Sequence, residues 1–226
     1  MFNHILLDEL PTVTTETIDR KRFYVTPEGN KYPSVTTVLN VRKNKELWEW
    51  RKKVGEEVAG YIARTAAQKG TKVHHMCEDF LNNMHINFPD KWEEHKKNFF
   101  PWCLFTQLKS VLKNIDNIHF QEAGLYSDKY GIAGRVDCIA EYNGKLSIID
   151  FKTSTKSRND DWNYNYYVQP SAYAEMYEER MGFPIDQIVI LVVTDDGTVQ
   201  EFVKEKEQMY LDTLKETLDI FHQRML

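Results

Sequence analysis

Two aspartates and a lysine stand on either side of one predicted tight turn. Asn143-Gly144 is a dipeptide typical of a two-residue hairpin loop, and strand-like residues flank it on both sides. If these two residues form the loop, Asp137 faces Asp150 across the hairpin, with their Cβ atoms about 4.5–5.5 Å apart. Lys152, two residues after Asp150, then projects from the same face.

Two facing carboxylates repel each other, so this arrangement requires a compensating partner. A proton held by one carboxyl group or a divalent cation between the two would provide it. Hard carboxylate oxygens suit Mg²⁺ or Mn²⁺. A lysine beside such an ion can stabilise charge on a phosphate or orient a water molecule. The alternative is a solvated Asp and Lys face on an edge strand, which the apolar run 146–149 before Asp150 disfavours.

The elements that would position these residues follow from periodicity and turn signals. Residues 32–39 form a short strand, or a short helix capped by Ser34 or Thr36. Gly70 is expected to end one helix, and Pro101 is expected to break another. The predicted helices are 45–68, 71–83, 89–114, 165–181 and 205–224, and the predicted strands are 119–126, 134–142, 145–152, 187–194 and 199–203.

This order of helices, three-strand antiparallel meander, helix, two strands and helix predicts an α/β fold with a mixed central sheet flanked by helices. No repeat or Gly/Ser linker interrupts the chain, which favours a single domain over residues 1–226. Within it we expect an N-terminal extension (1–44), a helical part (45–114) and a sheet core with a closing helix (115–226).

Composition excludes several classes of protein. The net charge is −5, from 29 basic and 34 acidic residues, so a wholly basic DNA-coating protein is excluded, whereas a nucleic-acid enzyme with a local basic stripe is not. The mean hydropathy is −0.56, and no apolar run approaches the roughly 20 residues of a membrane span. Residues 1–13 carry no Lys or Arg, so no secretory or mitochondrial leader is expected. The 3 scattered cysteines disfavour disulfides, a zinc knuckle or an iron–sulfur cluster, and they favour a cytoplasmic location.

Asp137 followed by Asp150-Phe151-Lys152 resembles the signature of the PD-(D/E)XK nuclease superfamily. Three more segments are similar to its RecB-like branch, which includes mitochondrial genome maintenance exonucleases and many phage members. The resemblance covers about residues 32–194 in the right order, with Val136 where the signature often has Pro. The segments are 70–78 (G-T-x-x-H-x-x-x-E), 169–173 (Q-x-x-x-Y) and 33–39.

The resemblance implies a restriction-endonuclease-like αβββαβ core and a role for each matching residue. It makes His74 a metal ligand beside Asp137 and Asp150, with the Phe151 carbonyl as a further ligand, and makes Glu78 a supporting acid. It also implies that Gln169 and Tyr173 contact DNA or hold the catalytic Lys152 and the scissile phosphate. Glu122, in the first strand of the meander, is a further candidate carboxylate. The alternatives are a surface helix pair for His74 and Glu78, an exposed strand position for Glu122, and helix packing for Tyr173.

Binding of the polymer requires local positive charge and stacking surfaces. Interleaved basic and aromatic residues suit a single strand, whereas a solvated helix face and internal packing are the alternatives. The aromatic candidates are Trp48, Trp50, Trp162, Tyr164, Tyr166 and Tyr167. The basic candidates are Arg42, Lys43, Lys45, Arg51, Lys52 and Lys53, followed by Lys156 and Arg158.

Together these patterns predict a DNA exonuclease that uses one or two Mg²⁺ or Mn²⁺ ions and no iron–sulfur cluster. The resemblance implies a 5′-phosphate product. We expect the enzyme to act on single-stranded or end-containing DNA in replication, recombination or repair, without a membrane partner. The alternatives are a structure-selective or sequence-specific endonuclease of the same fold, and a non-catalytic DNA-binding recombination module. The presence of Asp137, Asp150 and Lys152 together disfavours the last.

Overall fold

A five-stranded mixed sheet forms the centre of the computed structural model, which describes residues 1–42 and 45–224. The strands β4 (Ile115–Ser127), β5 (Ile132–Tyr142) and β6 (Lys145–Ser154) form an antiparallel meander around the Asn143-Gly144 turn. β7 (Gln187–Thr194) then pairs parallel to β6, and β8 (Val199–Glu205) pairs antiparallel to β7. The predicted mixed α/β fold is confirmed.

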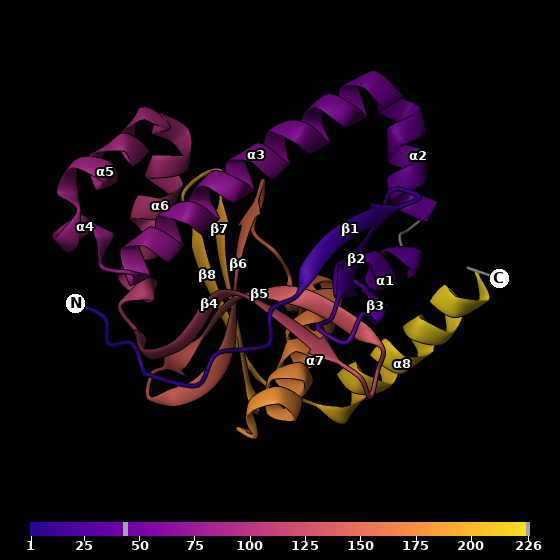
Figure 1. Ribbon diagram of the computed structural model, residues 1–226. Helices are drawn as coiled ribbons and strands as arrows, with labels where there is room; N and C mark the ends of the chain where they lie inside the picture. The colour runs from indigo at the N-terminus through magenta and orange to yellow at the C-terminus, as the bar shows by residue number, and fades with distance from the viewer. Residues whose placement is uncertain (43–44, 225–226) are drawn as a thin grey trace.

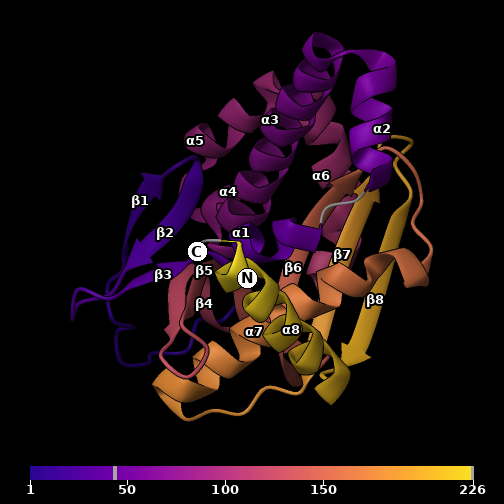
Figure 2. The ribbon, with the colours of Figure 1, turned by 90° about the vertical axis from the view of Figure 1, so that its right-hand side faces the viewer.

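Helices cover both faces of this sheet (Figures 1 and 2). On one face lie α3 (Glu56–Leu81) and α6 (Phe99–Leu112), and on the other lie α7 (Tyr164–Met181), α8 (Gln208–Gln223) and the short α1 (Val35–Leu39). Neighbouring strand residues serve the two cores in turn: Ile148 packs with the α7 side, and Ile149 packs with the α3 side. β7 is buried at every position because both of its faces are covered.

A second, three-stranded antiparallel sheet forms where the sequence predicted only an extension. It contains β1 (Thr14–Ile18), β2 (Lys21–Val25) and β3 (Lys31–Pro33), and it packs against the far end of the meander through Tyr24 and Tyr126. Of the two candidate caps, Ser34 is the one used, since its Oγ accepts the Thr37 N–H at 3.0 Å. The short helix η1 (Asn40–Arg42) follows α1.

The expected helix break at Gly70 is wrong. α3 continues through Gly70. A Cβ atom added at this glycine would lie 3.5 Å from Thr153 Oγ1. The break lies at Gly55, between α2 (Lys45–Val54) and α3, with φ +89°. A residue with a side chain rarely adopts this backbone conformation, so the turn between the two helices depends on glycine.

The expected helix 89–114 is divided, and Pro101 does not break it. The segment contains α5 (Pro89–Glu93), η2 (Glu94–Lys97) and α6, preceded by α4 (Met84–Asn87); η3 (Asp160–Asn163) precedes α7. Pro101 is accepted inside the first turn of α6, because a helix has no internal partner for its first N–H groups. Among the described residues, no helix is both long and apolar enough to cross a bilayer.

We predict opposite effects of alanine at the two glycines that flank the start of α3. Gly55→Ala should lower the free energy of unfolding by about 1–2 kcal/mol, because Gly55 has a positive φ. Gly60→Ala, in the helix interior with its Cβ 3.5 Å from Arg64 Nη1, should raise it by about 0.5–1 kcal/mol. Urea denaturation measures both, and equal stability of the two variants would contradict the assigned break.

Candidate active site

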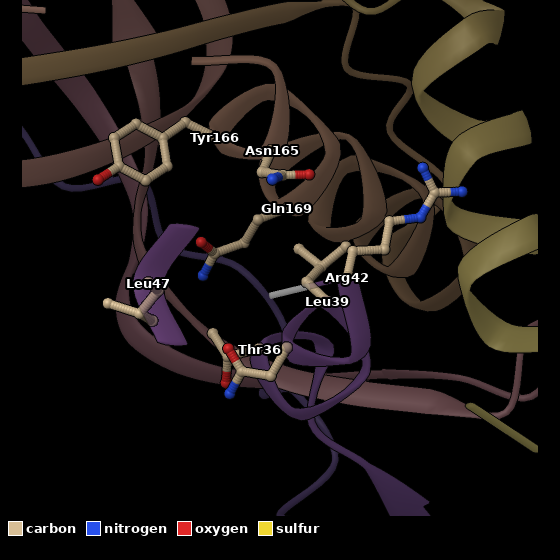
Figure 3. Close-up of a pocket in the computed structure, with 8 residues that line it drawn as sticks. Thr36, Leu39, Arg42, Leu47, Asn165, Tyr166 and Gln169 are labelled. Atoms are coloured by element: carbon tan, nitrogen blue, oxygen red, sulfur yellow. The ribbon is translucent and has the colours of Figure 1, made fainter. Parts of the chain in front are cut away.

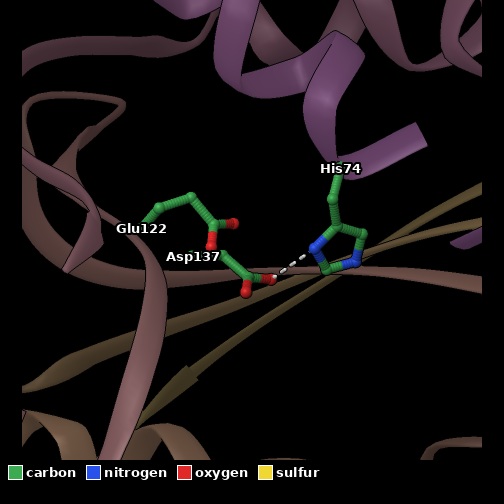
Figure 4. A group of neighbouring side chains, drawn as sticks. All are labelled: His74, Glu122 and Asp137. Atoms are coloured by element: carbon green, nitrogen blue, oxygen red, sulfur yellow. Dashed lines mark ion pairs between the residues drawn. The ribbon is translucent and has the colours of Figure 1, made fainter. Parts of the chain in front are cut away.

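Three potential metal ligands from three separate elements lie close together (Figure 4), at the level where the pairing of β5 with β6 ends. His74 comes from α3, Glu122 from β4 and Asp137 from β5, and one donor atom of each lies within 4.8 Å of the others. His74 Nδ1 is 3.4 Å from Asp137 Oδ2. All three side chains are partly buried. Two carboxylates and an imidazole at this spacing fit a divalent cation.

The pairing of β4 with β5 places Glu122 level with Asp137. Gln121 lies opposite Cys138 and Ala123 lies opposite Val136, so Glu122 falls between these two pairs. Its backbone has φ +47°, a left-handed conformation that is uncommon for a residue with a side chain. This local departure from strand geometry accompanies the turn of a carboxylate towards His74. Sequence patterns carry little information on such a kink, which is why Glu122 was expected only as a supporting residue.

The alternation of side chains along β5 breaks at the same level. Val136 and Ile139 both pack in the core beneath α7, although they are three residues apart, while Cys138 packs in the core beneath α3. Strict alternation would place residues at odd spacing on opposite faces. The break in alternation therefore lies at Asp137, between Val136 and Cys138.

The expected cross-strand pair of Asp137 and Asp150 does not form in the ladder. The register of β5 with β6 is the predicted one as far as Cys138 opposite Ile149, where the pairing ends. Beyond it, the Phe151 N–H donates to Asp137 Oδ2 at 2.9 Å, so the side chain of Asp137 takes a backbone bond at the splayed end of the hairpin. The predicted pair does not form because the pairing of β5 with β6 ends one position before Asp137 and Asp150.

Asp150 forms an ion pair with Lys152 and is not one of the three clustered ligands. Its side chain is 4% exposed and that of Lys152 is 22% exposed. Burial raises the pKa of Asp150 to about 6, against the lowering effect of Lys152. Burial alone would lower the pKa of Lys152, but the charges of Asp150 and Asp137 raise it above its usual value. Lys152 is therefore a cation at neutral pH.

Two further acids near the site, Glu122 and Glu78, also have raised pKa values. Burial, followed by the charges of Asp137 and Glu78, raises the pKa of Glu122. Burial likewise raises the pKa of Glu78, which lies one turn after His74 on α3 but outside the group of three ligands. The negative charge concentrated around Glu122 thus favours the binding of either protons or a cation.

Gln169 and Tyr173 meet on one face of α7, as their spacing predicted. Gln169 Nε2 donates to the Tyr173 hydroxyl at 3.1 Å. Burial raises the pKa of Tyr173 far above its usual value, so its hydroxyl stays neutral. An added Cβ on Gly134 would lie 2.6 Å from the Tyr173 ring, so glycine at this position gives the ring its space. The packing alternative therefore holds for the Tyr173 ring, while its hydroxyl fixes Gln169.

An open cavity of about 370 Å³ leads to two of the candidate metal ligands and to Lys152. His74, Glu122 and Lys152 line it, together with the backbone turn of α3 at Gly70 and Thr71. Thr153, the residue after Lys152, forms a further part of the wall. The cavity gives a polar ligand access to two of the three candidate ligands, His74 and Glu122, and to Lys152.

The predicted DNA-binding cations differ in what they contact. Arg42 pairs with Glu216 of α8, and Arg51 pairs with Glu56. Lys52, Lys53 and Lys156 are exposed, and Lys52 lies 5.1 Å from the centre of the Trp48 ring. Arg158 is held by Asn163 at 2.7 Å and lies over the Tyr166 ring. Lys43 and the side chain of Lys45 lie outside the described residues.

The aromatic candidates divide in the same way. Trp48 is 61% exposed and Trp50 is 36% exposed, on α2. Tyr167 is buried against Tyr210, and Tyr164 also packs against that ring, so these two serve the core. Tyr166 lies between Lys152 and Arg158, and the side chain of Trp162 lies outside the described residues. Among the candidates whose side chains are described, Trp48 and Trp50 are thus the exposed rings, and they lie on α2, which projects beyond the body (Figure 1).

Comparisons with known proteins show what the chain is similar to. A family model described as the PD-(D/E)XK nuclease superfamily matches residues 34–225. The human protein named mitochondrial genome maintenance exonuclease 1 is 24% identical over 180 residues, covering 67% of this chain and 51% of the relative. Its mouse counterpart is 28% identical over 183 residues, covering 76% and 52%. The chain spans about half the length of these relatives. A solved structure from Eubacterium rectale has a TM-score of 0.46 at 13% identity, covering 71% of this chain and 65% of that one.

We predict that Asp150 makes the metal-free protein less stable as the pH rises. Its pKa is about 6 in the folded state, against 3.8 for an exposed aspartate. The unfolded chain therefore loses this proton first, and the stabilisation present below about pH 4 is lost as the pH rises through 6. A shift of this size corresponds to roughly 3 kcal/mol.

Urea denaturation in EDTA at pH 4.5 and pH 7 would test this. The stability of Asp150→Asn relative to the wild type should rise between the two pH values by about 2 kcal/mol, because an unfolded-state aspartate is already largely ionised at pH 4.5. Because all other carboxyl groups are shared by the two proteins, their effects cancel in the difference. Parallel stability curves would contradict the assigned burial of Asp150.

Proposed function

We propose that this chain, which belongs to the PD-(D/E)XK nuclease superfamily, is a DNA exonuclease that requires Mg²⁺ or Mn²⁺. The observation that carries the proposal is the convergence of His74, Glu122 and Asp137 beside a buried Asp150–Lys152 pair in an open cavity. The name shared by the relatives is that of exonucleases in genome maintenance, which favours DNA ends as the site of action.

The donor set fits a divalent cation, and we propose that His74, Glu122 and Asp137 hold it. Asp150 and the Phe151 carbonyl stay as predicted further ligands, with one or two ions in the site. A bound ion of this kind polarises the phosphodiester and lowers the pKa of a coordinated water. Imidazole beside two carboxylates favours Mn²⁺ at least as much as Mg²⁺.

The residues of the chain supply the charge and the positions. Lys152, charged at neutral pH because of Asp150 and Asp137, would stabilise the negative charge that develops on the phosphate. Asp150 holds the ammonium in place through their ion pair. Gln169, fixed by the neutral hydroxyl of Tyr173, would orient the phosphate or the adjoining nucleotide. Tyr173 is therefore a positioning residue and not a base.

Single-stranded DNA is the polymer that the surface suits best. Trp48, Trp50 and Tyr61 are exposed on α2 and early α3, and Lys52 lies against Trp48. Rings that stand free beside cations can stack on unpaired bases, each stack contributing about 1–3 kcal/mol. We place the reaction in DNA replication, recombination or repair, in the cytoplasm or, for a phage-encoded enzyme, in the cytoplasm of the host.

Digestion of a circular single strand beside its linear form tests the proposed activity. With Mn²⁺ present, the proposal expects mononucleotides or short products from the linear strand and an intact circle. Cleavage of the circle would show an endonuclease instead. An inactive protein that binds both forms would favour the non-catalytic alternative.

We predict that the ligands and the lysine affect different kinetic quantities. Glu122→Gln and His74→Ala should each raise the Mn²⁺ concentration at half-maximal activity at least tenfold, because each removes a donor atom. Lys152→Ala should lower the turnover number at least a hundredfold without raising that midpoint, because it removes a cation and no donor atom.

A metal titration of activity separates these effects, with Glu57→Gln as the control. Glu57 is an exposed acid near the start of the same helix as His74. An unchanged midpoint in Glu122→Gln would remove Glu122 from the ligand set.

We predict that the two exposed lysines of α2 bind DNA phosphates. Replacing Lys52 and Lys53 with alanine should reduce the slope of log affinity against log salt by about 0.7 for each lost contact with a single strand. Salt titrations in the Asp150→Asn background measure this slope without digestion. Lys113→Ala combined with Lys215→Ala is the matched control, since both lysines are exposed, Lys113 at the C-cap of α6 and Lys215 on α8. Superimposable slopes for all three proteins would show that Lys52 and Lys53 are only a solvated surface.

A further inference from the structure

A second cavity lies beside Lys152, between α1, α2 and α7 (Figure 3). Its volume is about 290 Å³, at the small end of the range for ligand pockets, which leaves room for one small heterocycle. The Tyr166 ring forms part of its wall, and Lys152 Nζ lies 5.5 Å from the centre of that ring. The Tyr166 ring thus lies beside both the cavity and the candidate catalytic lysine. Its lining residues are Thr36, Leu39, Asn40, Arg42, Leu47, Asn165, Tyr166 and Gln169.

The chemistry of the walls suits a flat, neutral and polar ligand. Leu39 and Leu47 offer apolar surface, and Tyr166 offers an aromatic ring. The amide groups of Asn165 and Gln169 reach into the same space, as Figure 3 shows. An amide both donates and accepts hydrogen bonds, so it can match the edge of a nucleobase.

The charges around the cavity separate a base from its phosphate. Arg42, the cation in the lining, donates to Glu216 Oε2 at 2.9 Å, so its charge is balanced within the protein. Lys152 and Arg158 lie against the Tyr166 ring but do not line the cavity. A phosphate therefore finds its cations beside the ring, while a neutral group finds its partners inside.

We propose that this cavity holds one unstacked nucleobase of the bound strand, next to the phosphate that Lys152 contacts. The proposal rests on the nuclease function proposed above and adds a base-binding subsite to it. Gln169 links the two parts, because its amide lines the cavity while Tyr173 fixes its orientation at 3.1 Å. The enzyme should then contact the base at one position of its substrate much more closely than its neighbours.

Scanning a single abasic residue along an oligonucleotide tests this directly. Binding of each member of the series is measured with Asp150→Asn protein, which prevents digestion. Asn165→Trp in the same background fills the cavity from an exposed position, and Asn165→Leu removes only the amide. Gln223→Leu, which removes an exposed amide on α8, is the matched control.

The proposal expects one abasic position to weaken binding about tenfold, the loss expected for one stacked base. That position should become indistinguishable from its neighbours in Asn165→Trp, less marked in Asn165→Leu and unchanged in Gln223→Leu. Equal affinity at every position, or the same profile in Asn165→Trp and in its parent, would overturn it. Cleavage of the unmodified strand by the wild type is measured in parallel. A position-specific profile without cleavage would support the base site and contradict the nuclease function.

Discussion

Repulsion between carboxylates near the middle of β4, β5 and β6 is the constraint on which the site depends. Glu122 and Asp137 lie side by side with His74, and Asp150 is buried close to them. Like charges in such an environment are unfavourable unless a proton or a cation compensates them. Lys152 compensates Asp150 through their ion pair. Arg135 lies 3.8 Å from Glu122, and His74 lies 3.4 Å from Asp137. A divalent cation bound by both carboxylates would reduce their mutual repulsion further.

The acidic side chains come together because the pairing of β5 with β6 ends just before Asp137 and Asp150. Pairing of β5 with β6 ends at Cys138, and the freed Phe151 N–H binds the Asp137 carboxylate. On the other side, Glu122 leaves the regular strand conformation. α3 then brings His74 across the opening, while α7 brings Tyr173 into the space that Gly134 leaves. The candidate site thus lies where the regular strand geometry is interrupted, at Glu122 and Asp137.

The sequence predicted the parts that depend on regular geometry. The meander, the mixed character of the sheet and the shared face of Gln169 and Tyr173 follow from period and turn chemistry. It did not predict the role of Glu122, because a single left-handed residue in a strand leaves no periodic signal. The helix break moved from Gly70 to Gly55, since glycine alone does not say which backbone angle the chain will adopt. The small N-terminal sheet was missed because its mixed, polar strands lack an alternating pattern.

The central claim is that His74, Glu122 and Asp137 form one metal site, with Asp150 engaged by Lys152. The most direct measurement is an anomalous difference map from crystals of the wild-type protein soaked in Mn²⁺. We predict a peak within coordination distance of an imidazole nitrogen of His74 and a carboxylate oxygen of both Glu122 and Asp137. A peak held by Asp150 without His74 and Glu122 would contradict this claim. So would the absence of a peak near His74, Glu122 and Asp137 at saturating Mn²⁺.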